Sequence, residues 1–90
     1  MKIFKNKKKL IKEISNIEEI AFVPTMGALH EAHINLINKA KKKSNKVLIS
    51  IYVNPKQFNS KSDFKKYPRK LKKDILILNK LNVDYLYIPN

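Results

Sequence analysis

Cysteine is absent from this chain of 90 residues, and glycine occurs only once. Without cysteine there is no disulfide framework, no thiolate nucleophile and no cysteine-based zinc site. No segment approaches the run of about 20 apolar residues that a membrane-spanning helix needs. The N-terminus also lacks the uninterrupted apolar centre of a signal peptide. These absences predict a cytoplasmic protein that has no membrane partner.

Acidic residues are scarce as well: seven Asp and Glu stand against twenty Lys and Arg, which gives a net charge of +13. Such a charge attracts polyanions, so a non-catalytic, basic nucleic-acid-binding fragment is one interpretation. However, nineteen of the basic residues are lysines spread along the chain, whereas bidentate recognition of bases and phosphates favours arginine. We therefore expect solvated surface lysines and no specific nucleic-acid partner.

Hydrophobic spacing predicts alternating strands and helices. Strands are expected at residues 2–4, 20–23, 46–53 and 83–88, and helices at about 5–17, from 31 onward, and from 68 to 81. Pro24 is expected to end the second strand, and Pro68 to open the last helix at its first position. Residues 25–29 and 56–67 are expected to be loops, the second with room for a helical turn. The predicted fold class is α/β, a parallel sheet with flanking helices that is incomplete at the C-terminus.

Two helices are expected to bury one apolar face each. In the helix from Glu31, this face holds Leu36, Ile37 and Ala40. In the last helix it holds Leu71, Ile75, Leu78 and Leu81.

The scarce residue types gather in one stretch, PTMGALHEAH, from Pro24 to His33. It leaves a predicted strand and enters a helix, the place where ligands bind in open α/β sheets. Gly27 would let the backbone turn tightly or a ligand approach closely. The free N–H groups and the positive dipole end of the first helical turn suit a phosphate.

His30 and His33 are three residues apart, so their rings project from one side of a helix. Beside a phosphate they could stabilise developing charge, or one could act as general acid or base. Two other interpretations stay open. A metal site is disfavoured because zinc needs three or four ligands and the chain has no further His and no Cys. The second of these interpretations is that both are ordinary, partly buried histidines at the start of a helix.

Three blocks of this sequence resemble one family. VPTMGALHEAHINLINKA (23–40), ISIYVNPKQFN (49–59) and DFKKYPRKLKKDI (63–75) are similar to the N-terminal part of the pantothenate synthetases, or pantoate–β-alanine ligases. The first block is that family's version of the HIGH motif, which aminoacyl-tRNA synthetases and nucleotidyltransferases share. VNPKQF (53–58), at this distance from the HIGH-type motif, is far more specific to the family. The Tyr-Pro-Arg at 67–69 agrees with the same family.

The resemblance implies a Rossmann-like fold of the HIGH-motif nucleotidyltransferase type. Residues 1–90 would be the N-terminal part of the ATP- and pantoate-binding domain, with the C-terminal domain absent. The implied activity is an AMP-forming ligase that joins pantoate to β-alanine through pantoyl adenylate. ATP with Mg²⁺ would be a substrate, no organic cofactor would be tightly bound, and the full-length protein would be a homodimer. Another HIGH-motif nucleotidyltransferase is the alternative.

The resemblance also implies roles for particular residues. The expected ATP-binding residues are Met26, Gly27, Ala28, Leu29, His30, Glu31, Ala32 and His33. His30 and His33 would be catalytic, with His33 as proton donor, and Gln57 would hold pantoate near the β-alanine position. No metal-ligating residue is implied.

Four residues near these positions are expected to have structural roles. Asn54 and Pro55 would shape a turn. Tyr67 would pack under the loop, and Arg69 would hold down a carbonyl.

The chain departs from the family pattern in two ways. Ala32 stands where the family has glycine, so its methyl group is expected to weaken ATP binding. Family members are also roughly three times longer, so ninety residues are not expected to carry a complete active site.

Overall fold

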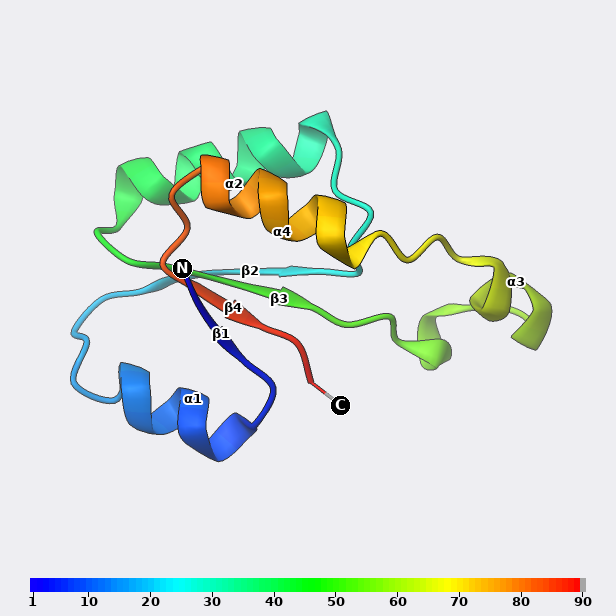
Figure 1. Cartoon of the computed structure of the whole chain (residues 1–90), viewed down its shortest axis with the longest axis horizontal. Coiled ribbons are helices and arrows are strands. Elements are labelled where there is room, and N and C mark those ends of the chain that lie inside the picture. The colour runs from blue at the N-terminus through cyan, green and yellow to red at the C-terminus, as the bar shows by residue number, and fades with distance from the viewer. Residues whose placement is uncertain (90) are drawn as a thin grey trace.

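The computed structural model describes residues 1–89 and contains a four-stranded parallel sheet (Figure 1). The strands are β1 (Lys2–Phe4), β2 (Ala21–Thr25), β3 (Val47–Ile51) and β4 (Tyr85–Tyr87). They pair in the order β1-β4-β3-β2, and each neighbouring pair is parallel. The predicted α/β parallel sheet is therefore confirmed.

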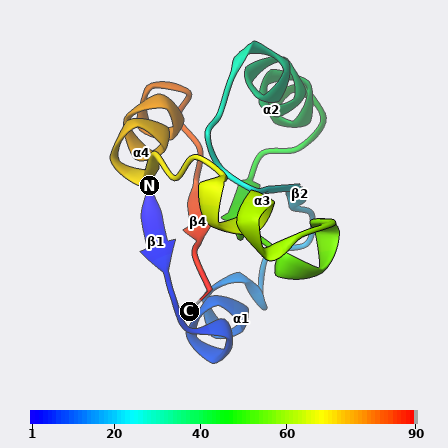
Figure 2. The ribbon, with the colours of Figure 1, turned by 90° about the vertical axis from the view of Figure 1, so that its right-hand side faces the viewer.

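Helices cover both faces of this sheet, as Figures 1 and 2 show. They are α1 (Lys7–Ile14), α2 (Glu31–Lys43), α3 (Lys61–Lys66) and α4 (Leu71–Lys80). The helices α2 and α4 lie together on one face, and α1 lies on the other. A 3₁₀ turn (Pro55–Gln57) and α3 follow β3 and extend beyond the carboxyl end of the sheet.

The core has two parts, one on each face of the sheet. Ile37 of α2 and Leu78 of α4 are completely buried against Ile49 and Leu86 of the central strands. On the opposite face, Leu10 of α1 packs against the strands in a smaller cluster. Every residue of β3 is buried, as predicted for a parallel strand covered on both faces.

The strand β2 continues through Pro24 to Thr25, so the prediction that Pro24 ends it was wrong. The backbone N–H of Ala21 and the carbonyl of Thr25 both bond toward β3. Because alternate residues face opposite edges, the nitrogen of Pro24 points to the open edge of the sheet. Proline is tolerated there, since no ladder bond needs its missing N–H.

The first helix is shorter than the expected 5–17, because the Asn6 side chain accepts the N–H of Lys9 and starts the helix at Lys7. The strands β3 and β4 are likewise shorter than the patterns 46–53 and 83–88 predicted. Apolar residues at strand ends pack in the core without joining the ladder. Val83, for example, is only 3% exposed although it precedes β4.

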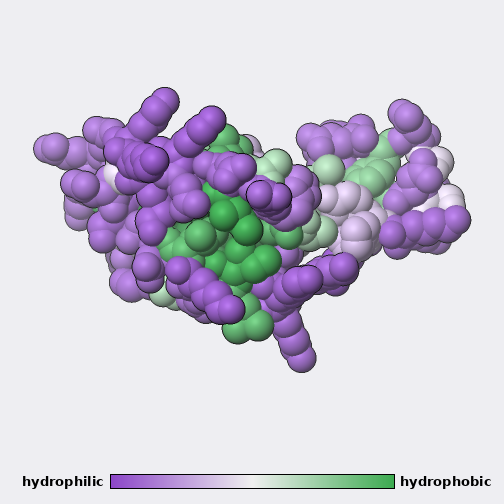
Figure 3. Space-filling model, turned by 90° about the horizontal axis from the view of Figure 1, so that it is seen from above, coloured by the Kyte–Doolittle hydropathy of each residue, from purple (hydrophilic) through white to green (hydrophobic). Residues whose placement is uncertain are grey.

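Three further expectations differ from the structure. Pro68 does not open the last helix, which begins at Leu71. The segment 56–67, expected to be a loop with room for a helical turn, contains the six-residue helix α3, which the Ser60 side chain caps. Leu36 does not face the core but is 52% exposed. On the face that carries α2 and α4, Figure 3 shows apolar side chains surrounded by hydrophilic ones.

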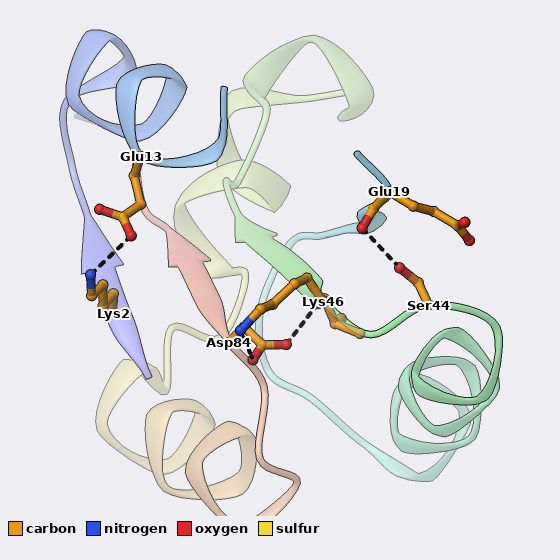
Figure 4. A network of polar contacts seen from close by, with 7 residues as sticks. Lys2, Glu13, Glu19, Ser44, Lys46 and Asp84 are labelled. Carbon is orange, nitrogen blue, oxygen red and sulfur yellow. Dashed lines mark hydrogen bonds and ion pairs between the residues drawn. The ribbon is translucent and has the colours of Figure 1, made fainter. Parts of the chain in front are cut away.

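Polar contacts secure the amino ends of the strands (Figure 4). Asp84 accepts the N–H of Val47 at 2.8 Å and pairs with Lys46. The Ser44 hydroxyl donates to the carbonyl of Glu19. No helix within residues 1–89 is long and apolar enough to cross a membrane.

Candidate functional site

The connection from β2 to α2 contains two consecutive residues in the left-handed region. Gly27 has φ 78° and Ala28 has φ 51°. A Cβ added to Gly27 would lie 3.0 Å from Cγ2 of Ile51 and 3.1 Å from a carboxylate oxygen of Asp74. The predicted tight turn at Gly27 is therefore confirmed, and the groups that approach it closely are protein side chains.

Sequence reasoning missed Asp74, which belongs to α4 and is only 2% exposed. Its two oxygens accept the N–H groups of Ala28 at 2.9 Å and Leu29 at 2.8 Å. These bonds join two segments that are more than forty residues apart in the sequence. The sequence held one signal for this residue, because Asp74 interrupts the apolar face that runs through Leu71 and Leu78. A carboxylate on a buried face needs a hydrogen-bond or charge partner.

His30 and His33 form a reciprocal cap at the start of α2. Nδ1 of His30 accepts the N–H of Ala32 at 3.3 Å, and Nδ1 of His33 accepts the N–H of His30 at 3.2 Å. The ring centroids are 4.2 Å apart. The predicted helix start at Glu31 is confirmed, and both histidines have the structural role that one interpretation gave them.

The cap also fixes the state of the His33 ring. Because Nδ1 uses its lone pair to accept an N–H, a neutral ring must carry its proton on Nε2. Desolvation lowers the pKa of His33 from its ordinary value of 6.5, and the neighbouring His30 lowers it further, while Asp74 opposes both effects. His33 is therefore neutral at neutral pH and has one N–H to donate.

A hollow of about 400 Å³ lies beyond the carboxyl ends of β2 and β3. It is lined by Pro24, Thr25, Met26, His33, Ser50, Tyr52, Asn54 and Gln57. Three of the expected site residues, Met26, His33 and Gln57, thus come together from separate parts of the chain. Ligands of open α/β sheets bind at this edge.

The other expected ATP-binding residues do not line this hollow. Gly27 and Ala28 line a neighbouring one of about 300 Å³, beside Arg69 and Asp74. Leu29 is buried in the core, so its side chain cannot contact a ligand.

The remaining three residues, His30, Glu31 and Ala32, are exposed at the helix start. The side chains of Asp74 and the two histidines accept hydrogen bonds from most of the backbone N–H groups around this turn. Among residues 1–89, the amide of Glu31 is the one near the start of α2 that has no protein acceptor, because the His33 amide is bonded to the His30 side chain in the reciprocal cap. This amide, together with the dipole of α2, is what the backbone at the helix start offers to an anion.

The structural roles predicted for four neighbouring residues are confirmed. The Asn54 side chain accepts the N–H of Lys56 and caps the 3₁₀ turn that Pro55 begins. Arg69 donates to the carbonyls of Phe64, Lys65 and Tyr67, and its guanidinium lies 5.0 Å from the centre of the Phe64 ring.

An aromatic cluster completes this segment. The Tyr67 ring packs edge-on against Phe58, with 5.4 Å between the centroids. Phe58 in turn packs edge-on against Phe64 at 5.5 Å. The segment that carries Gln57 is therefore held by its own small cluster.

Within residues 1–89, no three His, Asp or Glu side chains gather in a way that could hold a metal ion. Asp74, whose charge acts on His33, already accepts backbone N–H groups with both oxygens.

Comparisons with known proteins point to one family. A family model described as pantoate-beta-alanine ligase matches residues 2–90. The pantothenate synthetase of Francisella tularensis subsp. novicida is 53% identical over 73 residues, which are 81% of this chain and 28% of that protein. The pantothenate synthetase of Endomicrobium trichonymphae is 48% identical over 94 residues, covering 100% of this chain and 33% of that protein.

Similar solved structures come from the same family. The pantoate-beta-alanine ligase of Francisella tularensis, complexed with beta-gamma ATP and beta-alanine, matches 99% of this chain and 35% of its own at TM-score 0.94 and 47% identity. The enzyme of Thermus thermophilus matches 100% of this chain and 32% of its own at TM-score 0.93 and 36% identity. This chain therefore spans about a third of the length of these proteins.

Proposed function

The chain belongs to the pantoate-β-alanine ligase family, and we propose that it forms the N-terminal part of an enzyme that condenses pantoate with β-alanine using ATP. Residues 1–90 would be the N-terminal part of the Rossmann-like ATP- and pantoate-binding domain. The C-terminal domain would lie in the regions of the relatives that this chain does not span. Complete turnover would need those regions.

The observation that carries the proposal is the meeting of His33 and Gln57 in one hollow at the carboxyl edge of the sheet. In the proposed reaction, a pantoate carboxylate oxygen attacks the α-phosphorus of ATP and pyrophosphate leaves. The amine of β-alanine then attacks the acyl carbon of pantoyl adenylate and AMP leaves. Both steps need a held carboxylic acid beside a bound triphosphate or adenylate.

His33 would act on the phosphate side of this hollow. With Nδ1 occupied by the His30 amide, Nε2–H is its donor toward a phosphate oxygen. The neutral ring donates a hydrogen bond through this N–H. To transfer a proton, His33 would first have to be protonated on Nδ1, which would give up its bond from the His30 amide. The free amide of Glu31 and the helix dipole would add to the stabilisation of negative charge there. His30, exposed and engaged through Nδ1, would assist with its own Nε2–H.

Gln57 would hold pantoate. Its side chain is exposed beside the hollow, and an amide can both donate and accept hydrogen bonds. It can therefore bind a hydroxy acid without pairing a positive charge with the carboxylate that must act as nucleophile.

Mg²⁺ would bind through the phosphates of ATP. This fits the residues present, because the described part of the site contains no cluster of free carboxylates and Mg²⁺ usually keeps several waters beside substrate phosphates. The ion would supply charge shielding to the triphosphate. We further propose a homodimer in the cytoplasm, where ATP is available.

The test is isothermal titration of the chain with ATP and Mg²⁺, with and without pantoate. Saturable binding is expected, and His33→Gln should weaken it. Glutamine at this third helical position is the usual partner in a reciprocal cap, so the variant keeps the acceptor for the His30 amide and removes the imidazole.

Asn38→Gln, at an exposed and equally uncharged position of α2, is the matched control and should leave the affinity unchanged. Equal affinity of wild type and His33→Gln in chains with the same circular dichroism would contradict the proposed role of His33.

A second arm restores the missing regions. In a chimera, residues 2–90 would replace the matching segment of the Francisella tularensis enzyme. Pyrophosphate release that depends on pantoate supports the proposal, and release only with another acceptor contradicts it. Binding of duplex DNA or RNA that persists at about 150 mM salt would favour the nucleic-acid alternative, since lysine contacts with phosphates weaken as salt rises.

A further inference from the structure

The carboxylate of Asp74 is the most deeply buried charged group in the described chain, and it lies beside the proposed site without lining the hollow of His33 and Gln57. Both oxygens accept backbone N–H groups, one from Ala28 and one from Leu29. Burial of a carboxylate is unfavourable unless such bonds compensate it. Hydrogen bonds to a charged acceptor are among the strongest available to a backbone amide.

The segment that Asp74 holds has an unfavourable conformation. Ala28 has φ 51°, in the left-handed region that side chains with a Cβ rarely adopt. It follows Gly27, which is also left-handed, so the turn contains two consecutive residues in this region. Strained residues persist only where the surroundings over-determine them. The bonds from Asp74 to the next two amides supply that constraint.

The same turn is fixed from the side of the sheet. The Thr25 hydroxyl accepts the N–H of Gly27 at 3.2 Å and donates to the carbonyl of Ser50 at 2.9 Å. Thr25 thus ties the start of the turn to β3, while Asp74 ties its end to α4. The residue that follows Leu29 is His30, the cap of α2, and His33 lies one helical turn further.

We propose that Asp74 is a positioning residue for the nucleotide site, fixing the turn at Ala28 and Leu29 so that the start of α2 presents the His33 ring to the hollow. This inference rests on the proposed function for its ligand, but the placement of the turn does not. Asp74 acts through the backbone and not through contact with substrate, because its oxygens are already used.

The rival explanation is that Asp74 only stabilises the fold. Asp84 provides a matched control, because its carboxylate also accepts a backbone N–H, that of Val47 at 2.8 Å, but at the opposite, amino end of the sheet (Figure 4). Asp74→Asn and Asp84→Asn each replace one acceptor oxygen by an NH₂ group with almost no change in volume. Both variants are expected to lose stability under either explanation. The two explanations differ in what they predict for the turn and for ATP binding.

The experiment measures two quantities in wild type and both variants. The first is amide hydrogen exchange of Ala28 and Leu29 by NMR, without ligand. The second is the affinity for ATP with Mg²⁺ by titration. We expect Asp74→Asn to accelerate exchange at these amides and to weaken ATP binding about tenfold, the usual effect of losing a charged hydrogen bond. We expect Asp84→Asn to change neither.

A third variant tests the link between strain and positioning. Ala28→Gly removes the penalty for left-handed φ, so the turn needs less constraint. In the Asp74→Asn background it should recover part of the lost ATP affinity. Because relief of strain also stabilises the fold as a whole, the ATP affinities are compared at a temperature where every variant is fully folded; a rescue there reports positioning of the turn and not stability.

Each outcome decides a separate claim. Unchanged exchange at Ala28 and Leu29 in Asp74→Asn would overturn the inference, and so would equal losses of ATP affinity in Asp74→Asn and Asp84→Asn. If wild type binds no ATP although circular dichroism shows it folded, the proposed function of this chain fails, and amide exchange alone then decides whether Asp74 fixes the turn.

Discussion

His33 accepts the backbone N–H of His30 through Nδ1 at 3.2 Å, so the residue expected to donate a proton also closes the start of its own helix. Its Nε2–H is left for a ligand. Capping the helix and donating a hydrogen bond to a ligand are therefore compatible, because each uses a different nitrogen of the same ring.

The burial of His33 in the cap of α2 predicts that the stability of the fold depends on pH. The pKa of His33 is lowered in the folded chain, chiefly by desolvation, whereas the unfolded chain titrates near 6.5. Below pH 6.5 the unfolded state binds more protons than the folded state, so the free energy of unfolding falls as the pH drops through this window and is constant above it. Urea unfolding at a series of pH values measures the effect. His33→Gln should flatten this part of the profile, and a His33 ring that titrates above 6.5 by NMR would contradict the prediction.

Gly27→Ala should destabilise the fold by about 1–3 kcal/mol, because alanine at φ 78° is strained. Its methyl group would also press on Ile51 and Asp74. Ala28→Gly, at the next left-handed residue, is the matched control and should not destabilise. Denaturant midpoints give both values. A Gly27→Ala variant as stable as wild type would show that the turn can adopt another conformation.

Ala32→Gly should strengthen ATP binding. Ala32 is exposed in the first turn of α2, the helix start at which the nucleotide phosphates would bind. The measurement is the KM for ATP in the chimera described above. Ala40→Gly, further along the same helix, controls for the loss of helix propensity, about 1 kcal/mol for glycine. An unchanged KM for ATP in Ala32→Gly would sink this prediction.

Gln57→Glu should weaken pantoate binding in the chimera, because a carboxylate beside the hollow repels a carboxylate substrate. The KM for pantoate should rise at least about tenfold while the KM for ATP changes little. Lys56→Gln, at the neighbouring exposed position, makes the same change in net charge, and pantoate binding should respond to it far less. Equal responses would mean that general electrostatics and not position decides affinity.

Arg69→Lys should loosen the segment that carries Gln57. A guanidinium can reach three carbonyls at once, as it does at Phe64, Lys65 and Tyr67, whereas an ammonium is a single point charge. Each of these bonds stabilises the segment by about 1 kcal/mol. Hydrogen exchange over residues 58–67 should accelerate, while Lys70→Arg leaves it unchanged. Protection equal to wild type in Arg69→Lys would assign the rigidity to the aromatic rings instead.

Much of the fold was predictable because burial leaves a clear period in the sequence. The continuous apolar run of β3 and the three- and four-residue steps of α2 indicated their structure locally. The boundaries were less certain. Pro24 ends a strand by propensity, yet it sits in one here because β2 lies at the edge of the sheet that residues 1–89 form. Whether a strand lies at an edge depends on the order of the whole sheet.

The sequence by itself determined the α/β order, the position of the turn at Gly27 and the family motif, because these depend on neighbours in the chain. Only the tertiary structure decided that Gln57 shares a hollow with His33 and that Asp74 holds the turn. Both relationships join segments far apart in the sequence. No local pattern encodes them, since they arise when parallel strands bring their carboxyl ends to one edge and α4 packs beside the turn.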